Sequence, residues 1–205
     1  MISQLKWLNR GGKASEFQLK KIEEVLSNFL GKITVLEVGS AYGGAVEEIA
    51  KISKRINVYG YDTFEGHPKD LSKDVKSVEA VCMDYWYRSD VFGTSTLDYD
   101  FQLKVLKSLK LNNAHLVKGR INEKSFGDLD KIHFAMLDMD LIVPTRIAYE
   151  ALAPKIVQGG YMMFHDYGEN HLPLLLAFVD NVVIPSGLWE IESHKEDAFI
   201  FLKKK

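Results

Sequence analysis

The sequence predicts an α/β protein whose mostly parallel sheet carries helices on both faces. Short apolar runs typical of buried strands alternate along the chain with segments of helical periodicity, as in repeated β-α-β units. The last two strand-like runs are separated by residues 194–197, which are too few for a crossover helix and so predict an antiparallel hairpin. With 205 residues, 46% of them hydrophobic, the chain can bury a full core. We therefore expect a single domain over 1–205 with a seven-stranded sheet.

The first part of the chain begins with a clear helix signal. Ser15 followed by Gln18 matches a capping box, and apolar residues then recur at helical spacing within an expected N-terminal helical segment over 1–30. The elements expected in this part are a helix over 15–30, a strand over 33–38, a tight turn over 39–44, a helix over 45–53 and a strand over 57–61.

The helical and strand patterns are lost over 63–98. This stretch combines Pro68 and several charges with the aromatic residues Tyr85, Trp86 and Tyr87. Long irregular segments inside compact domains often form lids or binding loops. The segment is therefore interpreted as an insertion that closes over a substrate, with a satellite hydrophobic cluster over the sheet as the alternative.

Regular patterns return after residue 98. A helical face runs from Phe101 through Val105 to Leu109, and Pro144 suits the first turn of a later helix. Gly159-Gly160 predicts a break in the chain. The other elements expected here are strands over 114–118 and 132–137, a helix over 145–152, a strand over 161–164, a helix over 174–182, and strands over 188–192 and 198–202.

Composition narrows the partners of the protein. A net charge of −2 gives no electrostatic reason to expect nucleic acid or a membrane as a partner, and favours a small molecule or another protein. Cys82 is the only cysteine, which excludes an intramolecular disulfide and fits a reducing compartment. The first residues lack the pattern of a signal peptide, and no run reaches about 18 apolar residues. We therefore expect a cytoplasmic protein.

Acidic residues follow two of the predicted strands. Asp138 and Asp140 come after the run at 132–137, and His165 and Asp166 follow a later strand. Because parallel strands end at the same edge of a sheet, these side chains should form one polar cluster there. Because side chains alternate along a strand, we expect Asp138 and Asp140 to share a face and Met139 to point the other way. The pattern indicates a metal site or an acid/base pair, with solvated strand ends as the alternative.

The turn after the first predicted strand has the features of a cofactor loop. Gly39, Gly43 and Gly44 put small residues between a strand and a helix N-terminus, where a backbone can approach a ligand. With Glu37 two residues before the first glycine, the spacing is not the GxGxxG of dinucleotide folds. Asp62 ends the next strand, where an acid can bind the hydroxyls of a ribose. A ribose-bearing cofactor is favoured over glycines that serve only packing and an Asp62 that caps a turn.

These segments together form a more specific pattern than any of them alone. They are Glu37-x-Gly39 with Gly43-Gly44, Tyr61-Asp62-Thr63-Phe64-Glu65-Gly66-His67-Pro68, Leu137-Asp138-Met139-Asp140-Leu141 with Pro144-Thr145, Gly159-Gly160, and His165-Asp166-Tyr167. The chain resembles the macrocin O-methyltransferase family in these segments, which span residues 31–180. The resemblance implies a Rossmann-like class I methyltransferase fold and an enzyme that uses S-adenosylmethionine (SAM) to methylate sugar hydroxyls of natural-product glycosides.

The resemblance also implies a role for each matching residue. Asp138 and Asp166 match the family's ligands for a divalent cation, usually magnesium, and Asp140 matches its general base. The residues for which it implies cofactor binding are Glu37, Gly39, Ser40, Gly43, Gly44, Asp62, Thr63, Gly119 and Arg120.

His165 departs from the family pattern, which has an aspartate at this position. Magnesium prefers oxygen ligands, whereas imidazole suits zinc, iron, nickel or manganese-like ions better. Three interpretations remain open. The site holds a softer metal with His165 as a ligand, or it holds magnesium through Asp138, Asp166 and water, or it holds no metal and His165 is a catalytic acid/base group.

The sequence therefore predicts a SAM-dependent O-methyltransferase that acts on a hydroxyl of a sugar or glycosylated small molecule. Metal assistance is expected, with Asp140 as the base. No nucleic acid or membrane partner is expected, while a homo-oligomer is possible because relatives often assemble. The alternatives are a noncatalytic SAM-binding scaffold protein and an NAD-dependent oxidoreductase, which would need a different glycine spacing.

Overall fold

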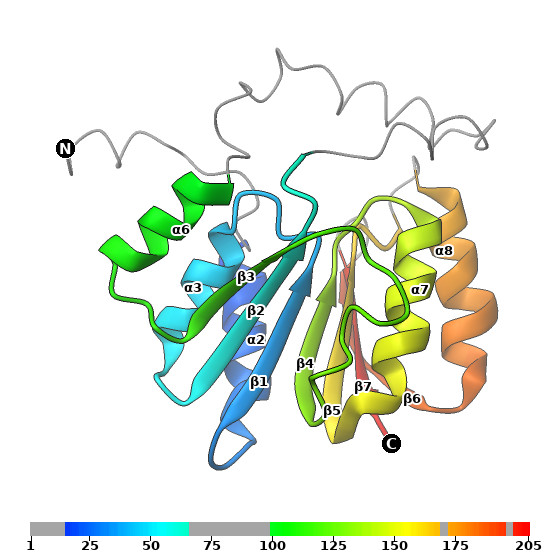
Figure 1. The fold of residues 1–205 in the computed structure, drawn as a ribbon. Coiled ribbons are helices and arrows are strands. Elements are labelled where there is room, and N and C mark those ends of the chain that lie inside the picture. Colours follow the sequence, from blue (N-terminus) through cyan, green and yellow to red (C-terminus); the bar gives the residue numbers. More distant parts are fainter. Residues whose placement is uncertain (1–14, 66–98, 169–171, 196–198) are drawn as a thin grey trace.

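The computed structural model describes residues 15–65, 99–168, 172–195 and 199–205. They form a seven-stranded sheet with the order β3-β2-β1-β4-β5-β7-β6 (Figure 1). Strands β1 to β5 are parallel, and β7 is antiparallel to both β5 and β6. The strands are β1 (Ile33–Val38), β2 (Ile56–Asp62), β3 (Ala114–Lys118), β4 (Ile132–Leu137), β5 (Ile156–His165), β6 (Trp189–Lys195) and β7 (Phe199–Lys204). The expected α/β fold with a C-terminal hairpin is confirmed.

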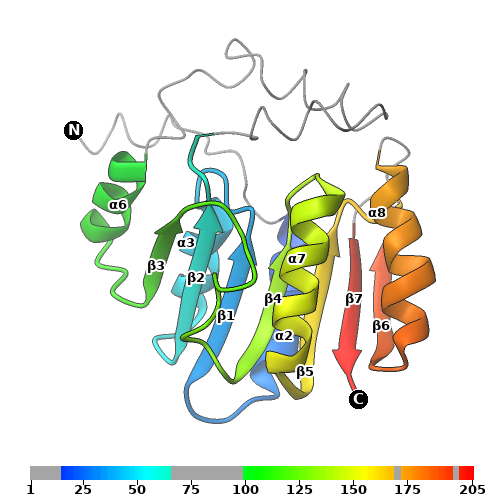
Figure 2. The same cartoon turned by 45° about the vertical axis from the view of Figure 1, so that its right-hand side comes forward.

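Helices cover both faces of this sheet (Figure 2). The first group, α2, α3 and α6, packs on one face, and α7 and α8 pack on the other. The helices are α2 (Glu16–Ser27), α3 (Gly44–Ile52), α6 (Tyr99–Ser108), α7 (Ile142–Leu152) and α8 (Pro173–Phe178), with short turns η2 (Ala153–Lys155), η3 (Val179–Val183) and η4 (Ile184–Ser186). At the start of α2, the Ser15 side chain accepts from the Gln18 backbone and the Gln18 side chain accepts from the Ser15 backbone, so the capping box is confirmed.

The alternation of side chains along each strand divides the core into two layers. In β1, Val35 packs into the layer beneath α2 and α3, whereas Leu36 packs into the layer beneath α7 and α8. In β4, Phe134 and Ala135 divide in the same way. Because both faces of these strands are buried, their sequences are apolar almost throughout, which is why sequence periodicity located them well.

The order of the strands reverses between β1 and β4. From β1 the chain moves outward through β2 to β3, and it then returns to place β4 on the other side of β1. Open α/β sheets bind their ligands at such a switch point, beyond the carboxyl ends of the strands. The loops after β1 and β4 therefore lie where a ligand site is expected.

The expected break at Gly159-Gly160 is wrong, because β5 continues through both residues. The pairing instead shifts register, from Ile132 opposite Ile156 to Phe134 opposite Tyr161. Gly159 has a positive φ of 73°, and a Cβ on Gly160 would lie 2.8 Å from a backbone oxygen of the same strand. The two glycines thus allow a bulge within the strand.

Two helices differ from their predicted patterns. The buried face of α6 is formed by Gln102, Val105 and Leu106, while Leu109 lies beyond the helix and is 42% exposed. The helix predicted over 174–182 is divided, because α8 ends at Phe178 and continues as the π-helical turn η3. A π-helical turn makes room for an extra residue without ending the helix.

Strand β7 lies between β5 and β6, although it follows both in the sequence. Its side chains Phe199 and Phe201 join the core layer beneath α2, while Ile200 and Leu202 join the opposite layer. Residue Phe199 pairs with His165, the last residue of β5. The hairpin therefore supports the strand that leads into the predicted polar cluster.

The expected insertion over 63–98 and the first part of the segment 1–30 fall largely outside the described residues. Their suggested roles stay predictions. Within the described part of the chain, no helix combines the length and the apolar character that a membrane crossing needs.

Gly39 offers a test of the contact between the β1 and β4 loops. Its φ is 92°, and a Cβ at this position would lie 1.8 Å from the backbone oxygen of Asp138. Gly31 has a similar φ of 78° and no atom within 4 Å of its would-be Cβ. We expect Gly31→Ala to lower the free energy of unfolding by about 1 kcal/mol, and Gly39→Ala by at least about 3 kcal/mol. Equal losses in urea denaturation would show that the close contact is unimportant.

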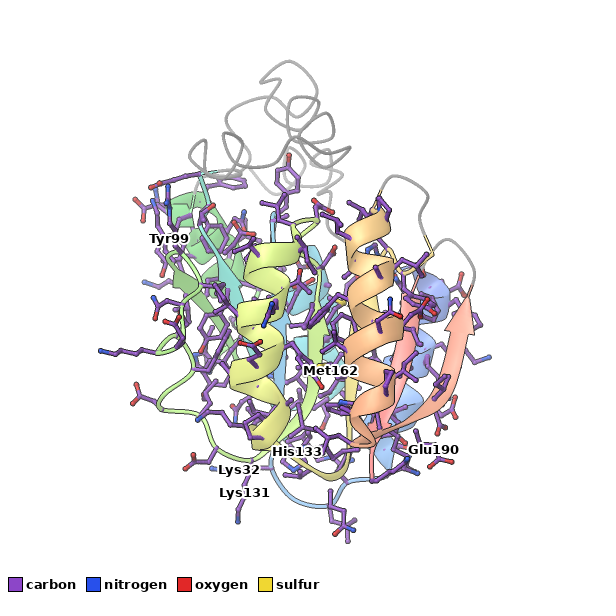
Figure 3. All side chains as sticks on the ribbon, turned by 90° about the vertical axis from the view of Figure 1, so that its right-hand side faces the viewer. Lys32, Tyr99, Lys131, His133, Met162 and Glu190 are labelled. Atoms are coloured by element: carbon purple, nitrogen blue, oxygen red, sulfur yellow. The ribbon has the colours of Figure 1, made fainter. Side chains whose placement is uncertain are left out.

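His133 should make stability depend on pH. It lies at the end of the sheet where Lys32 and Lys131 also lie (Figure 3), and its Nδ1 accepts a hydrogen bond of 3.1 Å from the Thr34 N–H. Partial burial lowers the pKa of His133 below 6.5. A hydrogen bond with the Lys131 backbone raises this pKa, but by less than burial lowers it. The folded protein binds a proton on His133 less readily than the unfolded chain does, so protonation of His133 favours unfolding. The contribution of neutral His133 to stability is therefore present above pH 6.5 and is lost as the pH falls through the lower folded pKa.

The non-titrating variant His133→Asn keeps an acceptor near the position of Nδ1. Between pH 7 and pH 5, the unfolding free energy of the unaltered protein should fall further than that of His133→Asn in parallel denaturation curves. Curves that stay parallel over this range would contradict the role of His133.

Candidate functional site

The loops at the carboxyl ends of four strands hold unusual backbone conformations. Ala41, Phe64, Asp140 and Asp166 have positive φ values of 42°, 52°, 58° and 57°, and they follow β1, β2, β4 and β5 respectively. Lys110, in another loop, is the fifth such residue other than glycine in the described part of the chain. Sparsely populated conformations of this kind cluster at functional sites, where the surrounding structure holds them in place. The backbone thus marks the same edge of the sheet that the sequence indicated.

The glycine turn is held by hydrogen bonds from two neighbouring elements. The backbone N–H groups of Gly39 and Ser40 donate to the Tyr61 oxygen of β2, at 2.8 and 3.2 Å. The Ala41 N–H donates to Asp62 Oδ2 at 2.8 Å, and the Ala41 oxygen accepts from Gln102 Nε2 at 3.0 Å. Both polar groups of Ala41 are therefore fixed by side chains, which keeps the turn in its positive-φ conformation.

Gln102 supports the glycine turn and was missed by the sequence interpretation. Its side chain is 2% exposed, although it lies on the helix face shared with Val105 and Leu106. A Cβ on Gly43 would approach its Oε1 to 2.7 Å, so the second glycine of the turn provides the space for Gln102. A polar residue at a core position of an amphipathic helix was the signal that could have identified it.

Asp62 is oriented by the turn on one side and by its own loop on the other. Its Oδ1 accepts from the Phe64 N–H at 2.8 Å, while Oδ2 accepts from Ala41. A carboxylate can accept about four hydrogen bonds, so acceptor capacity remains for the hydroxyls of a ligand. The Gly119 N–H donates to the Asp62 backbone oxygen at 2.9 Å, which brings the end of β3 beside this residue.

Thr63 and Arg120 lie in the loops that follow. The Thr63 Oγ1 is 3.4 Å from Asp62 Oδ1 and accepts from the Glu65 N–H at 3.2 Å, so Thr63 braces the loop after β2. Arg120 is exposed two residues beyond β3. Gly44 begins α3, directly after the glycine turn. The residues for which cofactor binding was predicted therefore all lie at one edge of the sheet.

Glu37 connects this half of the site with the acidic half. It is the second-last residue of β1 and is 2% exposed. Its Oε2 has no hydrogen-bond partner among the described residues. Burial raises the pKa of Glu37 well above its ordinary value, and the nearby carboxyls of Asp138 and Asp62 raise it further. Its neutral form is thus favoured unless a positive charge lies close to it.

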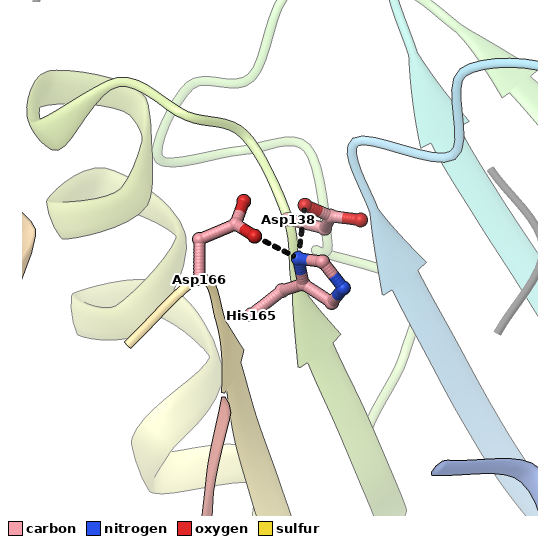
Figure 4. A group of neighbouring side chains, drawn as sticks. All are labelled: Asp138, His165 and Asp166. Atoms are coloured by element: carbon pink, nitrogen blue, oxygen red, sulfur yellow. Dashed lines mark ion pairs between the residues drawn. The ribbon is translucent and has the colours of Figure 1, made fainter. Parts of the chain in front are cut away.

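The acidic half is a cluster of Asp138, His165 and Asp166 (Figure 4). His165 Nδ1 lies 2.8 Å from Asp166 Oδ1 and 3.3 Å from Asp138 Oδ1. One potential ligand atom from each residue lies within 4.8 Å of the others. The side chains are 22–29% exposed, so the cluster is accessible at the surface of the site without being fully solvated.

The charges of this cluster perturb one another. Burial raises the pKa of Asp138 to about 7, with added repulsion from Asp140 and Asp166 and an opposing effect of His165. Burial alone would lower the pKa of His165, but the carboxylates of Asp138 and Asp166 raise it to about 9. The surroundings therefore favour a positive charge among these side chains, whether it is carried by imidazolium or by a bound cation.

The expectation that Asp138 and Asp140 share a strand face is wrong. β4 ends at Leu137, so both residues lie in the loop before α7, and Asp140 has a positive φ. Asp140 does not belong to the group of three potential ligands, but its charge raises the pKa of both Asp138 and His165. The structure therefore brings Asp138, His165 and Asp166 together and places Asp140 within electrostatic range.

The two halves of the site are in direct backbone contact. The Asp138 N–H donates to the Val38 oxygen at 2.8 Å, and Gly39 has no room for a Cβ beside the Asp138 oxygen. Glycine at position 39 thus allows the acidic loop to lie against the glycine turn at the switch point of the sheet.

Solved structures include close structural matches. The O-methyltransferase NovP superposes with a TM-score of 0.71 at 18% identity, over 91% of this chain and 79% of NovP. The calicheamicin methyltransferase CalS11, also described as a TDP-rhamnose 3'-O-methyltransferase, superposes with a TM-score of 0.67 at 16% identity, over 98% of this chain and 83% of CalS11.

A putative methyltransferase from Streptococcus mutans, in complex with SAH, superposes with a TM-score of 0.53 at 13% identity, over 91% of this chain and 97% of that protein. No family model and no curated protein sequence matches the chain. The structural matches extend over nearly the whole chain. The chain therefore has the Rossmann-like fold of the class I methyltransferases, as its motifs implied.

Proposed function

We propose that the protein is a SAM-dependent O-methyltransferase that methylates a hydroxyl of a sugar or glycosylated small molecule with the help of a divalent cation. The observation that carries the proposal is the contact of the acidic loop with the glycine turn, in which the Asp138 oxygen occupies the space of a Gly39 Cβ. This contact places a potential cation site beside a potential cofactor site.

The first half of the site suits SAM. SAM supplies a methyl group bound to a positively charged sulfur, and SAH, which is present in the complex of the S. mutans protein, is what remains after that methyl group has left. In this chain, Asp62 offers acceptors for ribose hydroxyls, and Glu37 offers a buried carboxyl whose ionised form a cationic ligand group would stabilise. The turn between them is fixed by Asp62 and Gln102, which hold both polar groups of Ala41.

The second half of the site suits activation of a hydroxyl. A divalent cation supplies a charge that lowers the pKa of a nearby hydroxyl group, and Asp138, His165 and Asp166 are the residues that would hold it. In the proposed reaction the acceptor oxygen bonds to the methyl carbon, the carbon–sulfur bond breaks, and its electron pair stays on sulfur. The hydroxyl proton passes to Asp140, the carboxylate beside the cluster.

A sugar acceptor is favoured by the matched enzymes and by the polar lining of the site. CalS11 is described as acting on TDP-rhamnose. A polar acceptor with several hydroxyls fits an edge of the sheet that presents carboxylates and an imidazole. We propose a small-molecule acceptor in preference to a nucleic acid, because the net charge of −2 gives no electrostatic reason to expect a polyanionic partner.

The base is tested by Asp140→Asn. Asparagine tolerates the positive φ of 58° at this position, so the loop should keep its conformation. Turnover on a panel of nucleotide sugars and glycosides, followed with methyl-labelled SAM, should fall at least about a hundredfold. SAM affinity measured by calorimetry should stay unchanged, as should turnover of the control Asp130→Asn, which alters a carboxylate that is 93% exposed.

Loss of SAM binding in Asp140→Asn would contradict the assigned role. Tight SAM binding by the unaltered protein, without methyl transfer to any member of a broad panel, would instead favour the noncatalytic alternative.

The cation is tested separately by chelation. Treatment with EDTA should reduce turnover while SAM still binds, and a divalent ion added in excess should restore turnover. If turnover is unaffected by chelation, the interpretation of His165 as an acid/base group without metal replaces the metal-assisted one.

A further inference from the structure

The acidic cluster of Asp138, His165 and Asp166 offers an imidazole nitrogen beside its carboxylate oxygens. We propose that the cluster selects a nitrogen-accepting transition-metal ion, of the manganese to zinc series, over magnesium, and that His165 binds this ion through Nδ1. The inference deepens the proposed function, in which the cation is already assigned to this cluster.

The positions of the ligand atoms fit a small ion. With bonds of about 2.1 Å to nitrogen or oxygen, two ligands at a right angle on an ion lie about 3.0 Å apart. His165 Nδ1 is 2.8 Å from one carboxylate oxygen and 3.3 Å from the other. These separations lie on either side of the expected value. Each carboxylate oxygen therefore lies at a distance from Nδ1 that allows the two atoms to bind one ion, and all three atoms lie within 4.8 Å of one another.

The surroundings of His165 Nδ1 also fit an ion bound to this atom. The atom is buried from solvent and has no hydrogen-bond partner with acceptable geometry in the described part of the chain, although two carboxylate oxygens lie near it. The other ring nitrogen is directed away from both carboxylates (Figure 4). A bound ion would use the lone pair of a neutral Nδ1, which neither carboxylate can do.

The backbone explains how two consecutive residues reach one ion. Side chains of adjacent residues in a strand point to opposite faces, so His165 and Asp166 would diverge if β5 continued. Instead β5 ends at His165, and Asp166 takes a positive φ of 57°. The next residue is anchored, because the Tyr167 hydroxyl donates to Asp180 Oδ1 on the π-helical turn η3 at 2.8 Å.

This ligand set decides between the classes of metal. Magnesium prefers six oxygen ligands and retains water, and an imidazole offers it little. The ions of the manganese to zinc series accept imidazole and carboxylate together, and their affinity for such sites rises towards the end of the series. Replacing one carboxylate of an all-oxygen site by His165 therefore shifts the preference of the site away from magnesium.

The test compares Mg²⁺, Mn²⁺, Co²⁺ and Zn²⁺ on the metal-free full chain by calorimetry at one pH. We expect Co²⁺ and Zn²⁺ to bind at least about a hundredfold more tightly than Mg²⁺, and His165→Asp to reduce this ratio at least about tenfold. The second variant His165→Asn should behave in the same way if His165→Asp fails to fold. His115→Asn removes a partly buried imidazole that stacks on Tyr59 in the sheet and should keep the full ratio.

Two spectroscopic readouts do not depend on catalysis. Co²⁺ should give visible absorption bands that change in His165→Asp and not in His115→Asn. In protein with ¹⁵N-labelled histidine, Zn²⁺ should perturb Nδ1 of a single histidine, and this perturbation should be lost in His165→Asp. A wild-type preference for Mg²⁺, a ratio that both His165 variants retain, or perturbation of Nε2 in place of Nδ1 would overturn the proposal.

SAM binding is measured in the same samples to separate this proposal from the proposed function. A chain that binds SAM and transfers methyl groups but prefers Mg²⁺ overturns the metal assignment and leaves the function intact. A chain that binds Co²⁺ through His165 but neither binds SAM nor transfers methyl groups overturns the function and supports the metal assignment.

Discussion

The site depends on the way the loop after β4 lies against the loop after β1. Two parallel strands that are neighbours at a switch point must diverge beyond their ends if a ligand is to enter, yet here they remain joined by the Asp138 N–H and the Val38 oxygen. A single position without a side chain, Gly39, makes this close approach possible. The glycine turn and the acidic cluster therefore adjoin each other through a direct backbone contact.

Around this contact, unusual backbone conformations help to fix the polar groups. Asp140 and Asp166 are aspartates in a region of φ that aspartate tolerates better than most residues. Ala41 has no such tolerance, and its conformation is held by Asp62 and Gln102. Strain of this kind is retained where it positions functional groups, which agrees with its location beyond β1, β2, β4 and β5.

Local signals made much of the fold predictable. The bounds of β1 and β4 agree with the expected 33–38 and 132–137, because nearly continuous apolar runs mark strands that are buried on both faces. The bounds of β3 also agree with the expected 114–118, although it is an edge strand in which only Leu116 is buried. The Ser15 capping box was recognisable because it depends only on residues three apart. The bulge at Gly159-Gly160 was not, because two glycines mark a turn and a strand irregularity equally well until the partner strand is known.

The site was predictable to a similar extent. The order of the strands brings the acidic tips to one edge, so the meeting of Asp138, His165 and Asp166 followed from the fold class. The support of Ala41 by Gln102 was not predictable, because it joins residues 61 positions apart and no local pattern encodes it. The expected shared face of Asp138 and Asp140 was wrong because it extended strand geometry beyond Leu137, where Asp140 has a positive φ.

The position of β7 affects how such a chain reaches its folded state. Within the described sheet, β6 has β7 as its only neighbour, and the free edge of β5 is covered by β7 as well. Until residues 199–204 are available, β5 therefore exposes unpaired backbone groups directly below His165, and β6 has no strand to join. Ordering of the cluster is thus coupled to the pairing of β5 with the last strand of the sheet. A chain arrested before that step would expose a sheet edge able to pair with other chains, while Asp138, His165 and Asp166 would lack the support of β7.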